Sequence, residues 1–196
     1  MKQKTVEENI ELCKKYPFLF PRNVWDDKPI EGYDYSWTEL DAIPDGWRIA
    51  FGDMLIEEIG EALELTNNLE TFRFDQIKEK YGSLRVYYHG GNEMVDRIIE
   101  KYSVLSENIC MKCGKPDVYM TNIGWIYPCC KDCWENNKYI KSSYKAAITG
   151  DARMEDKMKW RSMNPHDTEW VDNELDISAT AEKIREEYKK RCENLE

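Results

Sequence analysis

The stretch NICMKCGKPDVYMTNIGWIYPCCKDC, residues 108–133, decides how this chain can fold. It holds two C-x₂-C turns, and their separation falls within the C-x₂-C-x₁₅₋₂₀-C-x₂-C pattern of zinc sites. Two thiolates on one turn converge on a single ion, and a second turn completes a tetrahedron around it. Four protein ligands leave no open position for chemistry. We therefore predict a structural Zn²⁺ bound by Cys110, Cys113, Cys130 and Cys133.

Cys129 stands directly beside the second turn and offers an alternative ligand. A pair of Cys129 with Cys133 would have C-x₃-C spacing, which matches the first turn less well. We therefore expect Cys130 to bind the metal and Cys129 to pack as a small apolar side chain. Five unliganded or redox-active cysteines are the other interpretation, and an iron–sulfur cluster lacks supporting spacing.

The start of the sequence, MKQKTVEENI, lacks the apolar segment of a secretion signal. We therefore expect a cytoplasmic location, where the seven cysteines stay reduced. Paired C-x₂-C turns in a reducing compartment favour a metal over disulfides. No membrane association is expected either, because the longest uncharged run is too short to span a bilayer and contains Pro128.

Helical patterns precede the cysteine module. Thr5 and Glu8 form a capping box that predicts a helix over 5–15. Apolar residues recur every three or four positions over 46–66 and again over 92–106, which predicts two longer helices. Asp45 and Asn92 are suited to cap these two helices.

A β-hairpin is expected between the two longer helices. Residues 71–81 and 84–89 have strand patterns around Gly82-Ser83, a pair suited to a type II′ turn. In that register Tyr81 faces Leu84, Glu79 faces Val86 and Ile77 faces Tyr88. The proline- and aromatic-rich segment 17–44 is expected to wrap against the core, since large rings are costly to leave in water.

These elements predict an α+β protein, with helices and a β-hairpin as its core. We divide it into an acidic α+β domain over 1–105, a zinc-ribbon-like module with a following helix over 106–148, and a C-terminal extension over 149–196. The extension holds a helix over about 177–193 with a narrow apolar stripe. This stripe either packs on its own chain or pairs with a second one.

The charge balance narrows the class of partner. The chain has 28 Lys and Arg against 38 Asp and Glu, a net charge of −10. Such a molecule is repelled as a whole by nucleic acid and by anionic membranes. The segment 106–148 is the only part that is not acidic. No sequence motif for a nucleophile, a phosphate-binding loop or a catalytic metal is present.

Four strings in a fixed order carry a resemblance to a known family: GWRIAFG, QIKEKYGSLRVYY, SENICMKCGKP and GWIYPCCKDC. Together they resemble a family of uncharacterised bacterial, prophage and phage proteins, with an IKEKxGxLRxY hairpin followed by a CxxCG…CxxC zinc-ribbon-like module. The resemblance covers residues 46–135. It implies the same four zinc ligands and a phage or mobile-element setting, and it implies no activity.

We predict a non-enzymatic, zinc-stabilised binding protein. Its acidic surface would meet a basic host protein, such as a defence nuclease whose nucleic-acid channel is positive. The alternative is a nucleic-acid-binding accessory protein that uses the zinc ribbon and a stripe of three lysines, Lys138, Lys141 and Lys145. The lowest-ranked alternative is an enzyme of unfamiliar type built around His89, Arg85 and acidic neighbours.

Two groups of cations are candidate binding residues. The hairpin group comprises Lys78, Lys80 and Arg85, and the second group, on the helix expected after the cysteine module, comprises Lys138, Lys141 and Lys145. In the predicted register Lys80 faces Arg85, a like-charge pair that something acidic should offset. Internal pairing with acidic residues is the simpler interpretation of the hairpin group, and a solvated helix face is the simpler interpretation of the second group.

Overall fold

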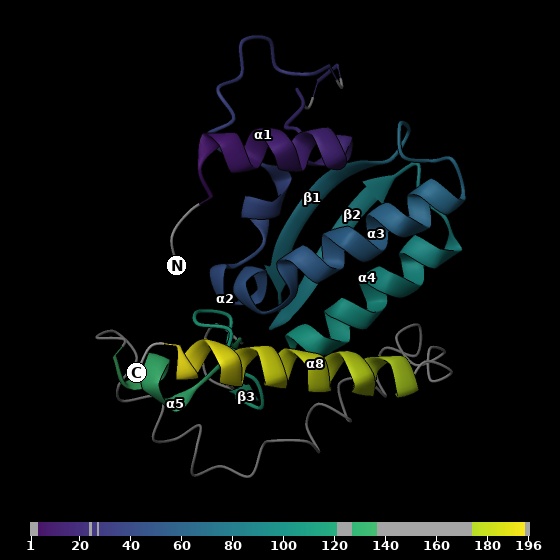
Figure 1. The fold of residues 1–196 in the computed structure, drawn as a ribbon. Coiled ribbons are helices and arrows are strands. Elements are labelled where there is room, and N and C mark those ends of the chain that lie inside the picture. The colour runs from purple at the N-terminus through teal and green to yellow at the C-terminus, as the bar shows by residue number, and fades with distance from the viewer. Residues whose placement is uncertain (1–3, 24, 27, 121–126, 137–173, 195–196) are drawn as a thin grey trace.

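A computed structural model of the chain describes residues 4–23, 25–26, 28–120, 127–136 and 174–194 (Figure 1). It confirms the α+β class. The helices are α1 (Val6–Lys15), α2 (Asp45–Trp47), α3 (Asp53–Leu65), α4 (Glu93–Ser106), α5 (Lys131–Glu135) and α8 (Glu174–Glu193), with single turns at Pro17–Leu19, Glu39–Ala42 and Arg48–Gly52. The strands are β1 (Arg73–Lys80), β2 (Ser83–His89), β3 (Tyr119–Met120) and β4 (Pro128–Cys129), paired antiparallel as β1–β2 and β3–β4.

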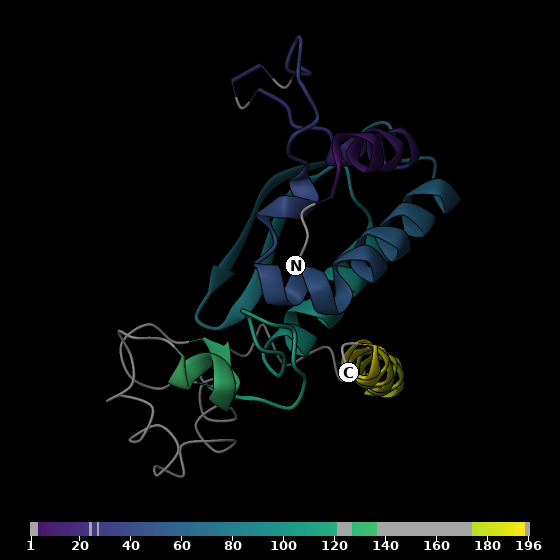
Figure 2. The ribbon, with the colours of Figure 1, turned by 60° about the vertical axis from the view of Figure 1, so that its left-hand side comes forward.

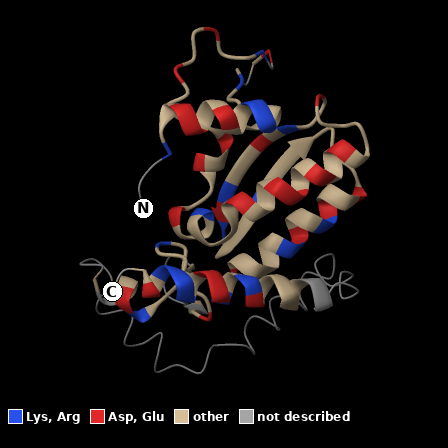
Figure 3. Cartoon of the chain, in the orientation of Figure 1, with Lys and Arg blue, Asp and Glu red and all other residues tan. Residues whose placement is uncertain are grey.

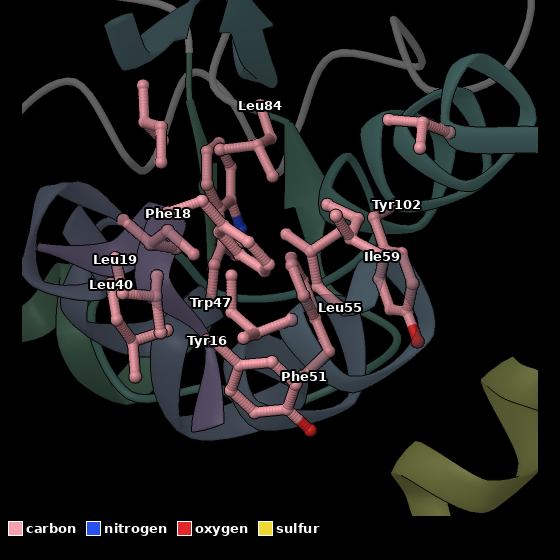
Figure 4. Close-up of a cluster of buried hydrophobic side chains, with 14 of the residues drawn as sticks. Tyr16, Phe18, Leu19, Leu40, Trp47, Phe51, Leu55, Ile59, Leu84 and Tyr102 are labelled. Carbon is pink, nitrogen blue, oxygen red and sulfur yellow. The ribbon is translucent and has the colours of Figure 1, made fainter. Parts of the chain in front are cut away.

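The hairpin and two helices form the main body in two layers. α3 and α4 lie side by side against the β1–β2 hairpin, and α1 crosses one end of this body (Figures 1 and 2). Apolar side chains from all of these elements meet in one core, including Trp47, Leu55, Leu84 and Tyr102 (Figure 4). Burial of these side chains is the main stabilising contribution to the body.

Two predicted helix caps are confirmed and one is wrong. The Thr5–Glu8 capping box begins α1, and the Asn92 side chain accepts from the first turn of α4. Asp45 caps nothing, because it is already the first helical residue after Pro44. Its carboxylate instead accepts from Arg48 Nη2 at 3.0 Å. The single helix expected over 46–66 is interrupted by a π-helical turn over Arg48–Gly52.

The predicted hairpin register is wrong by two residues. Ile77 pairs with Val86 and Glu79 pairs with Leu84, so the loop is Tyr81-Gly82 and not Gly82-Ser83. Both loop residues have positive φ, +54° and +80°, as a type I′ turn requires. A shift of two residues leaves every side chain on the same face. The apolar alternation therefore fits both registers equally well.

The aromatic segment after α1 only partly covers the core. Phe18 and Leu19 are buried, and Phe20 stacks edge-on with Tyr35 at 5.4 Å between ring centroids. The chain then leaves the body as a loop beyond α1 (Figures 1 and 2). Trp25 on this loop is 92% exposed. The expectation that the whole segment wraps against the core is therefore wrong for Trp25.

The last helix packs on its own chain, which decides between the two alternatives. Ile184 is buried in the main core, and Arg191 Nη1 donates to the Ile49 carbonyl at 2.6 Å. None of the helices in the described parts of the chain is long and apolar enough to cross a membrane. The predicted helix after the cysteine module, with Lys138, Lys141 and Lys145, lies outside the described residues.

Candidate metal centre

The four predicted cysteines come together at one point. The sulfur atoms of Cys110, Cys113, Cys130 and Cys133 all lie within 4.8 Å of one another, and those of Cys113 and Cys130 are 3.6 Å apart. Two of the four side chains are buried and two are half-buried. A compact set of four sulfur donors is positioned to bind a metal ion, and a soft sulfur set suits zinc.

Cys129 is not one of the four mutually close cysteines, although its thiol contacts the Cys110 sulfur. It belongs to β4, where its backbone pairs with Tyr119, and its thiol contacts the Cys130 carbonyl at 3.5 Å. Cys130 is the N-cap residue of α5, and its sulfur accepts from the Cys133 backbone N–H. The described geometry therefore places Cys130 in the cluster, as the matched spacing predicts. Cys129 packs with Tyr127 and Trp134 in a small second core.

The first cysteine turn sits directly on the start of α2. The Gly46 N–H donates to the Met111 carbonyl at 2.8 Å, and Trp47 Nε1 donates to the Ile109 carbonyl at 2.9 Å. A Cβ on Gly46 would lie 2.1 Å from the Cys110 carbonyl oxygen. Gly114 directly follows Cys113 and has a φ of +75°, a backbone conformation that favours glycine at the end of this turn. Close backbone contact at Gly46 thus fixes the module on the body.

Two further parts of the chain contact the module. The hairpin turn reaches it through Gly82, where a Cβ would lie 2.3 Å from the Met120 sulfur. Arg185 of α8 makes a bidentate ion pair with Asp117, in which Nε lies 2.9 Å from Oδ2 and Nη2 lies 2.8 Å from Oδ1. The metal centre therefore lies where α2, the hairpin and α8 converge.

The hairpin cations do not follow the predicted pairing. Lys80 pairs with Ser83, and Arg85 faces Lys78 instead. Among the described residues, neither of these two side chains makes an ion pair with a carboxylate. Arg85 Nη1 donates to the hydroxyls of Ser83 and Ser103, both at 2.7 Å, while Lys78 lies over the Tyr87 ring. Arg85 is therefore held by neutral partners, and its role in binding stays a prediction.

Sequence reasoning missed Glu39, a half-buried carboxylate in the turn before α2. The capping box of this turn uses Thr38 and Asp41, so Glu39 has no part in it. Among the described residues no hydrogen bond or ion pair holds its carboxylate, and burial raises its pKa to about 7. Glutamates before helices are common, so the sequence carries no signal that singles this one out.

The raised pKa of Glu39 predicts a pH-dependent effect of Glu39→Gln. Between the ordinary pKa of 4.5 and the folded value of about 7, the unfolded chain releases its proton while the folded chain keeps it. Wild-type stability therefore falls as pH rises through this window. We expect the variant to be more stable than wild type by about 1–2 kcal/mol at pH 8, allowing for solvent screening, and equal to it at pH 4. Urea unfolding at both pH values measures this; an equal effect at both would contradict it.

Comparison of the chain with models of protein families, with curated proteins and with solved structures finds no match. The resemblance of the hairpin and cysteine strings to phage and prophage proteins stays a prediction.

Proposed function

We propose that the chain is a zinc-stabilised binding protein that engages a basic partner protein. The four-cysteine cluster supports the first part, because four sulfur ligands on two rigid turns match structural zinc sites. The described part of the cysteine module has only two-residue strands and the short helix α5, so the ion would supply the folding energy that its small core lacks. Its role is to hold a shape, with no open coordination position for substrate.

Trp25 is the observation that carries the binding role. Its indole is 92% exposed on a loop that extends away from the body. Exposing so large an apolar ring is unfavourable in water, and tryptophan is enriched among the residues that dominate binding energy at interfaces. The exposed acidic residues Asp26, Glu31 and Asp34 lie on the same loop. Lys28 on this loop pairs with Asp26 at 3.3 Å, which leaves Glu31 and Asp34 as the acidic groups beside the apolar anchor. An apolar anchor with acidic neighbours suits a basic surface with an apolar pocket.

Acidic residues continue from this loop over the neighbouring helices. Figure 3 shows carboxylates along α1 and α3. On α3 they recur at helical spacing on the exposed side, at Asp53, Glu57, Glu61 and Glu64. Such a surface would steer a positively charged partner. The partner we propose is a host protein in the phage or prophage setting that the resemblance implies, for example a defence nuclease whose positive channel the acidic surface would occupy.

Replacing Trp25 tests the binding role. Crosslinking in lysate of the natural host, followed by mass spectrometry, identifies the partner, and calorimetry then measures affinity. We expect Trp25→Ala to weaken binding at least ~30-fold, the effect of losing a hot-spot side chain worth about 2 kcal/mol. Its free energy of unfolding should change by less than about 0.5 kcal/mol, because the side chain has few contacts to lose.

Leu65→Ala is the matched control, since Leu65 is also an exposed apolar residue, at 73%, but lies at the end of α3. It should leave affinity unchanged. Equal affinity of wild type and Trp25→Ala would contradict the proposed loop. Absence of any protein partner at low salt would contradict the function itself.

Nucleic-acid binding through Lys138, Lys141 and Lys145 stays the alternative. It predicts a mobility shift of DNA or RNA at roughly 50 mM salt that weakens steeply as salt rises. Loss of the shift on replacing these lysines would favour it over the protein-binding role.

A further inference from the structure

A cavity of about 340 Å³ opens at the edge of β1, away from the metal centre. Its apolar wall includes Phe20 and Phe74, both half-buried rings. Glu39 lines it, as do Arg73 and His89, which pair with each other across the hairpin. Ligand pockets have volumes from about 300 Å³ upward and combine apolar walls with a few polar groups that converge. This cavity has the size of such a pocket, and its lining joins three phenylalanine rings to six polar residues.

The strand is irregular where it borders the cavity. The pairing of β1 with β2 shifts between Phe74 and Gln76, which leaves Asp75 as an extra residue in a β-bulge. Asp75 Oδ1 lies 2.8 Å from His89 Nδ1. Bulges are over-represented beside functional sites because they redirect side chains. Here the bulge brings an imidazole–carboxylate pair to the cavity rim, next to Arg73.

The carboxylate of Glu39 indicates which chemical groups a ligand of this cavity would carry. This half-buried carboxylate has no hydrogen-bond or ion-pair partner among the described residues. A half-buried carboxylate without a protein donor depends on water for its hydrogen bonds, and a ligand with N–H groups would take the place of that water. A carboxylate has two oxygens, so it suits two adjacent N–H donors in one plane. Arg22 and Arg73 also line the cavity, and a guanidinium suits an anionic group on the ligand.

We propose that this cavity binds a small planar molecule that presents N–H donors to Glu39 and an anionic group to Arg73, with its ring against Phe20 and Phe74. A nucleoside monophosphate with a guanine base has this chemistry, because its base edge carries adjacent N–H donors and its phosphate fits a guanidinium. A free aromatic amino acid, with its ammonium and carboxylate groups, offers a related arrangement. This site is separate from the metal centre, and it borders the base of the Trp25 loop, where Asn23 lines the cavity and accepts from the Trp25 backbone N–H.

Titration of the zinc-loaded full chain with guanosine monophosphate, followed by NMR and calorimetry, tests the proposal. Adenosine monophosphate and tryptophan serve as comparison probes. We expect saturable one-to-one binding of guanosine monophosphate, weakened at least ~10-fold by Glu39→Gln and by Arg73→Lys. Glu39→Gln removes one acceptor oxygen, and Arg73→Lys keeps the charge but loses the planar fork. Glu70→Gln, an exposed carboxylate between α3 and β1 that does not line the cavity, is the matched control and should bind like wild type.

Each outcome decides the proposal. Binding of guanosine monophosphate that depends on Glu39 and Arg73 supports it, and the same dependence with tryptophan supports the cavity with an amino acid as ligand. Binding of all probes that neither variant weakens overturns it, as does the absence of saturable binding by any probe. Amide chemical shifts of the folded variants verify that a loss reflects the site and not the fold.

Discussion

Cys130→Ser is expected to remove stoichiometric zinc from the protein and to unfold the module around it. Native mass spectrometry should show one zinc ion per wild-type chain and none in the variant. Zinc binding to small four-ligand sites contributes about 10–16 kcal/mol, and this energy is coupled to folding. We therefore expect the free energy of unfolding to fall by at least about 3 kcal/mol. Serine keeps an oxygen that can cap α5 in place of the Cys130 sulfur, so loss of the cap does not explain the fall.

Cys129→Ser is the control for this change, because it makes the same substitution one residue earlier. Burying a hydroxyl beside Tyr127 and Trp134 costs about 1–3 kcal/mol. The variant should nevertheless retain one zinc ion. If Cys129→Ser loses the metal and Cys130→Ser retains it, the ligand set proposed here is wrong. If the wild-type chain carries no zinc, the structural role of the cluster is wrong altogether.

Gly46→Ala is expected to have the second large effect. An added Cβ would lie 2.1 Å from the Cys110 carbonyl oxygen and 2.5 Å from the Met111 carbonyl carbon, both backbone atoms. Real Cβ atoms essentially never approach so closely, so α2 or the cysteine turn must move. Overpacking of this kind costs about 3 kcal/mol or more when backbone has to shift. Denaturant unfolding measures the loss, and competition with a chelator should show weaker zinc retention.

Gly52→Ala provides the comparison within the same helical segment. Its added Cβ would meet side-chain carbons of Arg48 and Leu40 at 3.2 Å, and these can move aside. The change should stay within about 1 kcal/mol, since alanine also has the better helix propensity. Similar stabilities for both alanine variants would show that the contact of Gly46 with the cysteine turn tolerates adjustment.

The sequence predicted those features that depend on residues close together in the chain. The caps at Thr5 and Asn92, the apolar stripes of the helices and the two cysteine turns each depend on residues only a few positions apart. The hairpin register was missed because its two candidate loops differ by two residues and leave the same side chains inward. Only the backbone of Tyr81, with its positive φ, separates them.

The remaining parts of the site were beyond prediction because they join distant segments. Nothing near Gly46 in the sequence indicates that a cysteine turn packs on it. The cavity likewise draws Glu39 from one turn and Arg73 from a later strand. Such contacts become visible only when the chain is folded, since one sequence without its fold gives no pairing between segments.

The docking of α8 has a consequence for the order in which this protein matures. Arg191 binds the Ile49 carbonyl across a sequence separation of 142 residues, and Ile184 enters a core whose other buried members lie between Cys13 and Ile109. A ribosome delivers these two residues only after it has delivered the segments that they contact. During synthesis the nascent body therefore exposes the apolar surface that α8 later covers, and chaperones and proteases recognise such surfaces. A prematurely terminated product that lacks α8 would be marked for degradation by that patch.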